Sequence, residues 1–118
     1  MKKQLLVIDD EPSMLKLLHF ILAEDYDLII KSNSVEALAW LEKGNFPDLI
    51  LTDQDMPTID GLTLIKNLKA SGFFRNIPVF LVSGSDTILE SAEDLPVQYF
   101  KKPFNPTVLK SAIASVLQ

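Results

Sequence analysis

Acidic, hydroxyl and basic side chains gather in four short segments of this sequence. The four segments are Asp9-Asp10-Glu11, Asp53-Gln54-Asp55, Ser83-Gly84-Ser85 and Lys101-Lys102-Pro103. Each follows a short apolar run, so each predicts a polar turn at the end of a buried strand. If those strand ends share one edge of a sheet, three carboxylates, a hydroxyl and an ammonium group converge there.

The carboxylates of Asp9, Asp10 and Asp53 would repel one another at such an edge. Some would keep their protons unless a cation entered, and oxygen ligands in partly octahedral geometry suit Mg²⁺. Mg²⁺ beside a carboxylate, a lysine and a hydroxyl is what phosphoryl transfer requires, because that reaction depends on positioning and on charge neutralisation. The residue types therefore point to phosphoryl-transfer chemistry, with a carboxylate as the acceptor.

The composition restricts the ligands and partners. There is no cysteine and a single histidine, which excludes disulfides, thiolate catalysis and zinc-thiolate sites. A net charge of −5, from 16 acidic and 11 basic residues, argues against binding nucleic acid or an anionic membrane through bulk charge. No apolar stretch approaches the roughly 20 residues that span a bilayer, and acids follow the first apolar run too early for a signal peptide. We expect a cytoplasmic protein that has no membrane partner.

The elements that must position the four segments alternate along the chain. Unbroken apolar runs predict five strands, each buried on both faces, at residues 5–8, 28–30, 49–51, 79–82 and 97–100. Helical spacing and capping residues predict five helices, over residues 13–24, between Asn33 and Gly44, over 61–70, near 87–92, and after Asn105-Pro106.

This alternation predicts a (βα)5 fold, a doubly wound parallel sheet of flavodoxin-like topology with strand order 2-1-3-4-5. A chain of 118 residues suits one domain, so we expect residues 1–118 to form a single unit. Ligands of such folds bind at the carboxyl ends of the strands, between the first and third strands. That is where Asp9, Asp10 and Asp53 would meet.

The polar segments and their neighbours resemble the receiver domain of two-component response regulators over the whole chain. The matching stretches are residues 7–12, residues 48–57 with Asp60-Gly61, residues 82–84 and residues 102–104. The resemblance implies that Asp53 is phosphorylated from a kinase phosphohistidine. It also implies that Asp9, Asp10, Asp53 and the backbone carbonyl of Asp55 hold Mg²⁺.

Further roles follow from the same resemblance. Lys102 and Ser83 would bind the phosphoryl group, Tyr99 would be the switch aromatic, and the Lys102–Pro103 bond would be cis. Asp55 and Ser85 would occupy the positions that modulate the lifetime of the phosphorylated state. The segment between Ser83 and Lys102 is a few residues shorter than is usual for the family, and Leu95-Pro96 replaces a small Gly-Ala pair.

The implied partners are a sensor histidine kinase or histidine phosphotransfer protein and a downstream protein target. The target would bind the surface formed by the fourth helix, fifth strand and fifth helix. Such a receiver is not an enzyme acting on a separate substrate, but promotes its own aspartyl phosphorylation and dephosphorylation.

Three alternatives remain open from the sequence. A haloacid-dehalogenase-type phosphatase would use Asp53 and Asp55, although that family carries its Asp-x-Asp motif on the first strand. A flavodoxin-type electron carrier shares the topology, but Asp9-Asp10-Glu11 would repel a phosphate. An unphosphorylated docking scaffold is disfavoured by the intact acids, serine and lysine.

Overall fold

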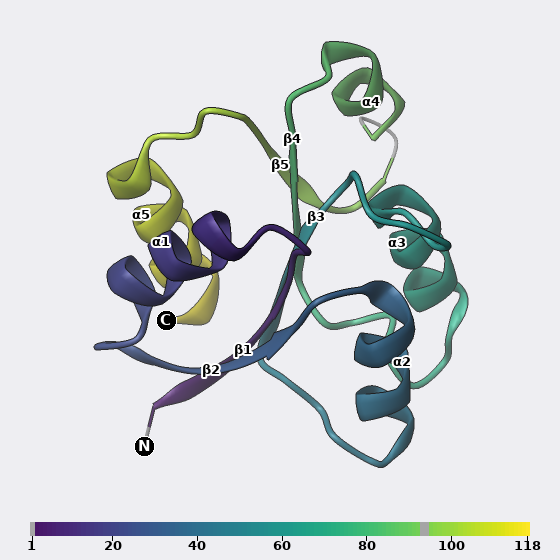
Figure 1. Ribbon diagram of the computed structural model, residues 1–118. Coiled ribbons are helices and arrows are strands. Elements are labelled where there is room, and N and C mark those ends of the chain that lie inside the picture. The colour runs from purple at the N-terminus through teal and green to yellow at the C-terminus, as the bar shows by residue number, and fades with distance from the viewer. Residues whose placement is uncertain (1, 93–94) are drawn as a thin grey trace.

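The computed structural model describes residues 2–92 and 95–118, which form a five-stranded parallel sheet flanked by helices (Figure 1). The strands are β1 (Lys3–Ile8), β2 (Tyr26–Lys31), β3 (Leu49–Asp53), β4 (Val79–Ser83) and β5 (Gln98–Lys101). The helices are α1 (Pro12–Leu22), α2 (Ser34–Glu42), α3 (Gly61–Ala70), α4 (Asp86–Ser91) and α5 (Pro106–Leu117). The strand order is β2-β1-β3-β4-β5, which confirms the predicted topology.

Alternate side chains of the central strands enter two separate cores. Leu5 and Val7 of β1 pack in the core beneath α1 and α5, whereas Leu6 and Ile8 pack in the core beneath α2 and α3. Figure 1 shows the two helix pairs on opposite sides of the sheet. Because both faces are covered, the central strands carry unbroken apolar runs.

The expectation that all five strands are buried on both faces is wrong for β2 and β5. Every residue of β3 and β4 is buried, but the two outer strands are largely half-buried or exposed. Ile30 of β2 is 39% exposed and Tyr99 of β5 is 40% exposed. The reason is their position: each pairs with a neighbour on one side only, so sheet and helices cover it incompletely.

Side-chain caps fix the starts of three helices. Asn33 Oδ1 accepts the Glu36 N–H at 2.8 Å, and Asn105 Oδ1 accepts the N–H groups of Thr107 and Val108, as the capping pattern predicted. Asp60 caps α3 in the same way. Helix α1 ends at Leu22, two residues before the expected end, and α4 lies one residue before its predicted range. Residues 93–94, within the shortened segment, lie outside the described residues.

The connection between β3 and α3 is tight. Thr58 has a positive φ of 71°, an uncommon conformation for a β-branched residue. A Cβ atom on Gly61 would lie 2.6 Å from the Asp53 carbonyl oxygen, so α3 begins directly against the end of β3. None of the helices in the described parts of the chain combines the length and hydropathy needed to span a bilayer.

Candidate functional site

The register of the central strands brings three aspartates together at the carboxyl edge of the sheet. Ile8 of β1 pairs with Thr52 of β3, so Asp9 and Asp53 follow at the same level. One carboxylate oxygen from each of Asp9, Asp10 and Asp53 lies within 4.8 Å of the other two. Asp9 and Asp53 are buried and Asp10 is exposed. The acidic cluster predicted from the sequence is therefore present and opens to solvent through Asp10.

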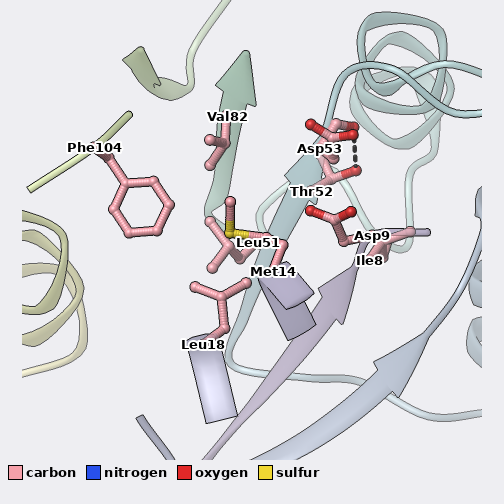
Figure 2. A pocket seen from close by; sticks show the side chains of 9 residues that line it. All are labelled: Ile8, Asp9, Met14, Leu18, Leu51, Thr52, Asp53, Val82 and Phe104. Carbon is pink, nitrogen blue, oxygen red and sulfur yellow. Dashed lines mark hydrogen bonds between the residues drawn. The ribbon is translucent and has the colours of Figure 1, made fainter. Parts of the chain in front are cut away.

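A small cavity lies beside the two buried carboxylates. Met14, Leu18 and Phe104 line its apolar side, and the carboxylates of Asp9 and Asp53 lie at its polar end (Figure 2). Apolar walls of this kind exclude the water that would otherwise solvate the negative charges. The cavity thus explains why ionisation is costly at this edge.

Burial raises the pKa of Asp9 to about 6, and the negative charges of Asp53 and Asp10 act in the same direction. The Glu11 N–H, which donates to Asp9 Oδ1 at 2.9 Å, and the Lys102 ammonium oppose this rise. Burial also raises the pKa of Asp53, and pairing with Lys102 does not fully offset it. Burial therefore holds the pKa values of both Asp9 and Asp53 above the usual range of an aspartate.

Lys102 is the basic residue that reaches the cluster. Its Nζ lies 2.7 Å from Asp53 Oδ1. Burial would lower the pKa of Lys102, but the contact with Asp53 and the charges of Asp9 and Glu11 together outweigh burial and raise it. The neighbouring Lys101 points away and pairs with Asp86 on the surface at 2.8 Å, as strand alternation predicts. The Lys102–Pro103 bond is cis, as the family resemblance implied.

The other predicted residues differ in how closely they approach the cluster. Ser83 is buried at the end of β4, and its Oγ accepts the Ser85 N–H at 3.1 Å. Ser85 Oγ accepts the Ile88 N–H at 3.3 Å and so caps α4. Tyr99 lies on the outer strand, and the Asp55 side chain is exposed. The structure thus joins Lys102 directly to the acids and leaves Tyr99 and the Asp55 carboxylate at the periphery.

The donor set fits a hard divalent cation. Asp53 Oδ1 is buried, and the Lys102 ammonium contacts it at 2.7 Å. An ionised carboxylate has about four lone-pair sites on its two oxygens, so Asp53 can bind a metal ion while it keeps its contact with Lys102. Three neighbouring carboxylates supply the oxygen ligands that Mg²⁺ prefers, and one of them faces solvent.

The sequence profile of the response regulator receiver domain matches residues 5–114. The chain belongs to this family. As a receiver domain it is a module of two-component signalling, and receiver domains act as switches between histidine kinases and downstream targets.

Two curated relatives illustrate the range of proteins that contain such a receiver domain. The chain is 31% identical to the alkaline phosphatase synthesis transcriptional regulatory protein PhoP of Bacillus subtilis, over 100% of this chain and 50% of that protein. It is 29% identical to the chemotaxis protein CheY1 of Helicobacter pylori, over 97% of this chain and 96% of that protein. The chain thus spans about half of one relative and nearly all of the other.

Solved receiver structures share the fold. A putative response regulator of Chloroflexus aurantiacus superposes with a TM-score of 0.91 at 26% identity, over 99% of this chain and 98% of that chain. The signal receiver domain of a histidine kinase from Syntrophus aciditrophicus superposes with a TM-score of 0.88 at 32% identity, over 98% and 89% of the two chains. The receiver fold therefore extends over nearly all of this sequence.

Sequence reasoning assigned no role to Gln54, a buried polar residue beside the acidic cluster. It lies between Asp53 and Asp55, is 3% exposed, and its Oε1 accepts the Leu62 N–H at 2.8 Å. The sequence feature that could have pointed to Gln54 is the predicted start of a helix near Gly61, because the first N–H groups of any helix need acceptors from outside it. A buried amide directly before that connection is a suitable acceptor.

Proposed function

We propose that this receiver domain is a phosphorylation-dependent switch in which Asp53 accepts a phosphoryl group. The observation that carries the proposal is the position of the Asp53 carboxylate, buried at the end of β3 between two further aspartates and the Lys102 ammonium. The donor would be a phosphohistidine of a sensor histidine kinase or histidine phosphotransfer protein. An Asp53 oxygen would form the new bond to phosphorus, and the imidazole nitrogen would leave with the electron pair of the broken bond.

Asp9, Asp10, Asp53 and the backbone carbonyl of Asp55 would hold Mg²⁺. The ion would neutralise charge on the phosphoryl oxygens during transfer. Asp53 presents its carboxylate to the incoming phosphorus, and Asp10 provides the exposed side of the cluster through which a donor approaches. The raised pKa values of Asp9 and Asp53 support this assignment, since a divalent cation relieves the repulsion that burial magnifies.

Phosphorylation would change the partners of two neighbouring side chains. The Lys102 ammonium would bind a phosphoryl oxygen in place of the bare carboxylate. The Ser83 hydroxyl, now bound by the Ser85 N–H, would donate to another phosphoryl oxygen. Because Ser85 caps α4, a shift of Ser83 would reach the surface formed by α4, β5 and α5, where Tyr99 is half-exposed. We propose that a downstream protein binds this surface, with residues 1–118 acting as one unit.

The phosphatase alternative required Asp53 and Asp55 to act together. The Asp55 side chain is exposed, and the three-carboxylate cluster instead joins Asp53 to Asp9 and Asp10. The motif also follows β3 and not the first strand. The geometry thus favours the signalling switch over turnover of a separate phosphate ester.

The decisive experiment compares the wild type with Asp53→Asn after incubation with acetyl phosphate and Mg²⁺. Intact-mass measurement should show a gain of one phosphoryl group in the wild type and no gain in Asp53→Asn. Asp27→Asn, which alters an exposed aspartate of β2, is the matched control and should gain the group. An equal gain in Asp53→Asn would disprove Asp53 as the acceptor.

The lifetime of the phosphorylated state should depend on Asp55. Hydrolysis needs a water in line with the leaving oxygen, and the exposed Asp55 carboxylate can accept a hydrogen bond from that water. Ser85 is less free to do so because its hydroxyl already accepts the Ile88 N–H. Asp55→Ala should lengthen the lifetime, followed by intact mass after removal of the donor. An unchanged or shorter lifetime would leave Asp55 only its backbone carbonyl as a contribution.

A further inference from the structure

Gln54 holds both ends of the connection between β3 and α3. Its N–H donates to the Val82 carbonyl of β4 at 3.0 Å, and its own carbonyl accepts the Gly61 N–H at 3.0 Å. Its side-chain Oε1 accepts the Leu62 N–H at 2.8 Å. One residue beside the phosphoacceptor is thus bonded to the neighbouring strand and to the first two residues of α3.

These bonds complete the first turn of α3. The N–H groups of Gly61 and Leu62 are satisfied by Gln54, and the Thr63 N–H donates to Asp60 Oδ1 at 2.8 Å. The Thr63 N–H lowers the pKa of Asp60, and the side chains of Thr63 and Gln54 act in the same direction. Because Gln54 is only 3% exposed, water cannot readily replace its amide if the side chain is shortened or made apolar.

The loop between these two anchor points is under strain. Thr58, in the middle of residues 55–60, has a φ of 71°, and such a conformation persists in a β-branched residue only where the surroundings impose it. Met56 is 9% exposed and holds the loop to the core. If the end of the loop at Leu62 came loose, the backbone could relax toward negative φ. The carbonyl of Asp55 would move with it.

We propose that Gln54 is a positioning residue for the metal: its buried amide ties β3 to α3 and so fixes the loop that directs the Asp55 carbonyl toward Mg²⁺. This inference rests on the proposed function, because it takes the Asp55 carbonyl as a ligand. Gln54 does not contact the ion or the phosphoryl group. Groups that hydrogen-bond to a metal ligand restrict where the ligand atom can lie. Gln54 would act in the same way, through the loop that it fixes.

The first test measures Mg²⁺ affinity by calorimetric titration of the full chain with MgCl₂. Gln54→Met keeps the length of the side chain but removes the amide, and we expect the dissociation constant to rise about 10-fold. Asn33→Ala is the matched control, because it removes a helix cap from α2 and lowers stability without touching the loop. Its dissociation constant should stay near that of the wild type. A wild-type affinity in folded Gln54→Met would overturn the inference.

The second test needs no variant. Coupling between two sites is reciprocal, so if opening the Gln54–Leu62 bond weakens Mg²⁺ binding, Mg²⁺ must suppress that opening by the same factor. Saturating Mg²⁺ should therefore slow hydrogen exchange at the Leu62 amide more than at the Glu36 amide, the corresponding capped position of α2. Equal slowing at the two amides would reflect general stabilisation alone and would contradict the inference.

Two further measurements separate this inference from the function on which it rests. If Asp10→Ala binds Mg²⁺ as tightly as the wild type, the proposed metal site is wrong and the role of Gln54 falls with it. If Asp10→Ala loses affinity while Gln54→Met retains it and Leu62 exchange is unaffected, only the role of Gln54 is wrong.

Discussion

The two ends of the parallel sheet differ in how completely the chain satisfies their side chains. At the amino ends of β3 and β4, Phe46, Phe73 and Phe74 form an aromatic cluster in which the rings of Phe46 and Phe73 meet edge to face at 5.6 Å. At the carboxyl ends, Asp9 and Asp53 are buried with raised pKa values. At the amino end aromatic rings pack on one another, although Phe46 and Phe73 stay more than half exposed, whereas the carboxyl end buries carboxylates that Lys102 compensates only in part.

The stability that is given up for function is therefore lost at the carboxyl edge of the sheet. Surrounding a carboxylate with apolar walls lowers stability. The packing of the aromatic cluster at the amino end does not require a carboxylate to be buried at the carboxyl edge. The variants below should therefore raise stability or weaken ligand effects at the carboxyl end, and should cause only small losses at the amino end.

The largest effect should come from Asp9→Asn without metal. The native pKa of Asp9 is raised from 3.8 to about 6, so the native state holds its proton more tightly than the unfolded chain. The stability that this bound proton adds to the native state is fully present below pH 3.8 and is lost as the pH rises through about 6. At pH 7 in EDTA, Asp9→Asn should be more stable than the wild type by about 3 kcal/mol, since two pKa units correspond to about that free energy.

Urea unfolding at pH 4 and pH 7 provides the measurement. The advantage of Asp9→Asn should be small at pH 4 and large at pH 7. If the stability of the two proteins depended on pH in the same way, the pKa of Asp9 would not be raised in the native state.

Mg²⁺ should have the next largest effect. A ligand that binds only the native state adds about 2.7 kcal/mol at 100 times its dissociation constant. The wild type should gain this stability at the corresponding Mg²⁺ concentration, and Asp10→Ala should gain less, because Asp10 supplies one of the three clustered carboxylates. Melting curves with and without Mg²⁺ test this, and an identical shift in both proteins would count against the site.

The smallest effect is expected at the amino end. Phe73 is 64% exposed and contacts two other rings, so Phe73→Ala should cost about 1 kcal/mol. Phe20→Ala is the matched control, because Phe20 is 85% exposed and its loss should change stability by less than about 0.5 kcal/mol. Both variants should gain a phosphoryl group as the wild type does. An altered phosphoryl gain in Phe73→Ala would show that the amino and carboxyl ends of the sheet are coupled.

Much of the fold was predictable because each central element has a local signature. Residues 49–51 form an unbroken apolar run, and they are the buried start of β3. Asn33 is followed by a glutamate three residues later, and it caps α2. The exposure of the edge strands was missed, although the predicted order 2-1-3-4-5 already placed the second and fifth strands outermost. A short apolar run such as the one around Tyr99 does not by itself distinguish an edge strand from a central one.

The candidate site was predictable where the strand order brings residues together, and not where a hydrogen bond depends on the backbone conformation of one loop. The aspartates follow apolar runs, and Lys102 precedes a proline, so their convergence follows from the topology. The bond between Gln54 and Leu62 joins residues eight positions apart across a loop of unusual backbone conformation. A pattern of residue types does not specify that geometry.

The close approach at Gly61 also limits how the sequence can vary. Even the single methyl group of alanine would press against the Asp53 carbonyl oxygen, at 2.6 Å, and the Leu81 side chain, at 2.8 Å. Either α3 would have to retreat from the sheet, or β3, which carries Asp53 of the candidate site, would have to shift. A library of all substitutions, selected only for folding, should therefore enrich glycine at position 61 strongly. The glycines at positions 72 and 84, where a Cβ would meet nothing within 4 Å, should accept many replacements.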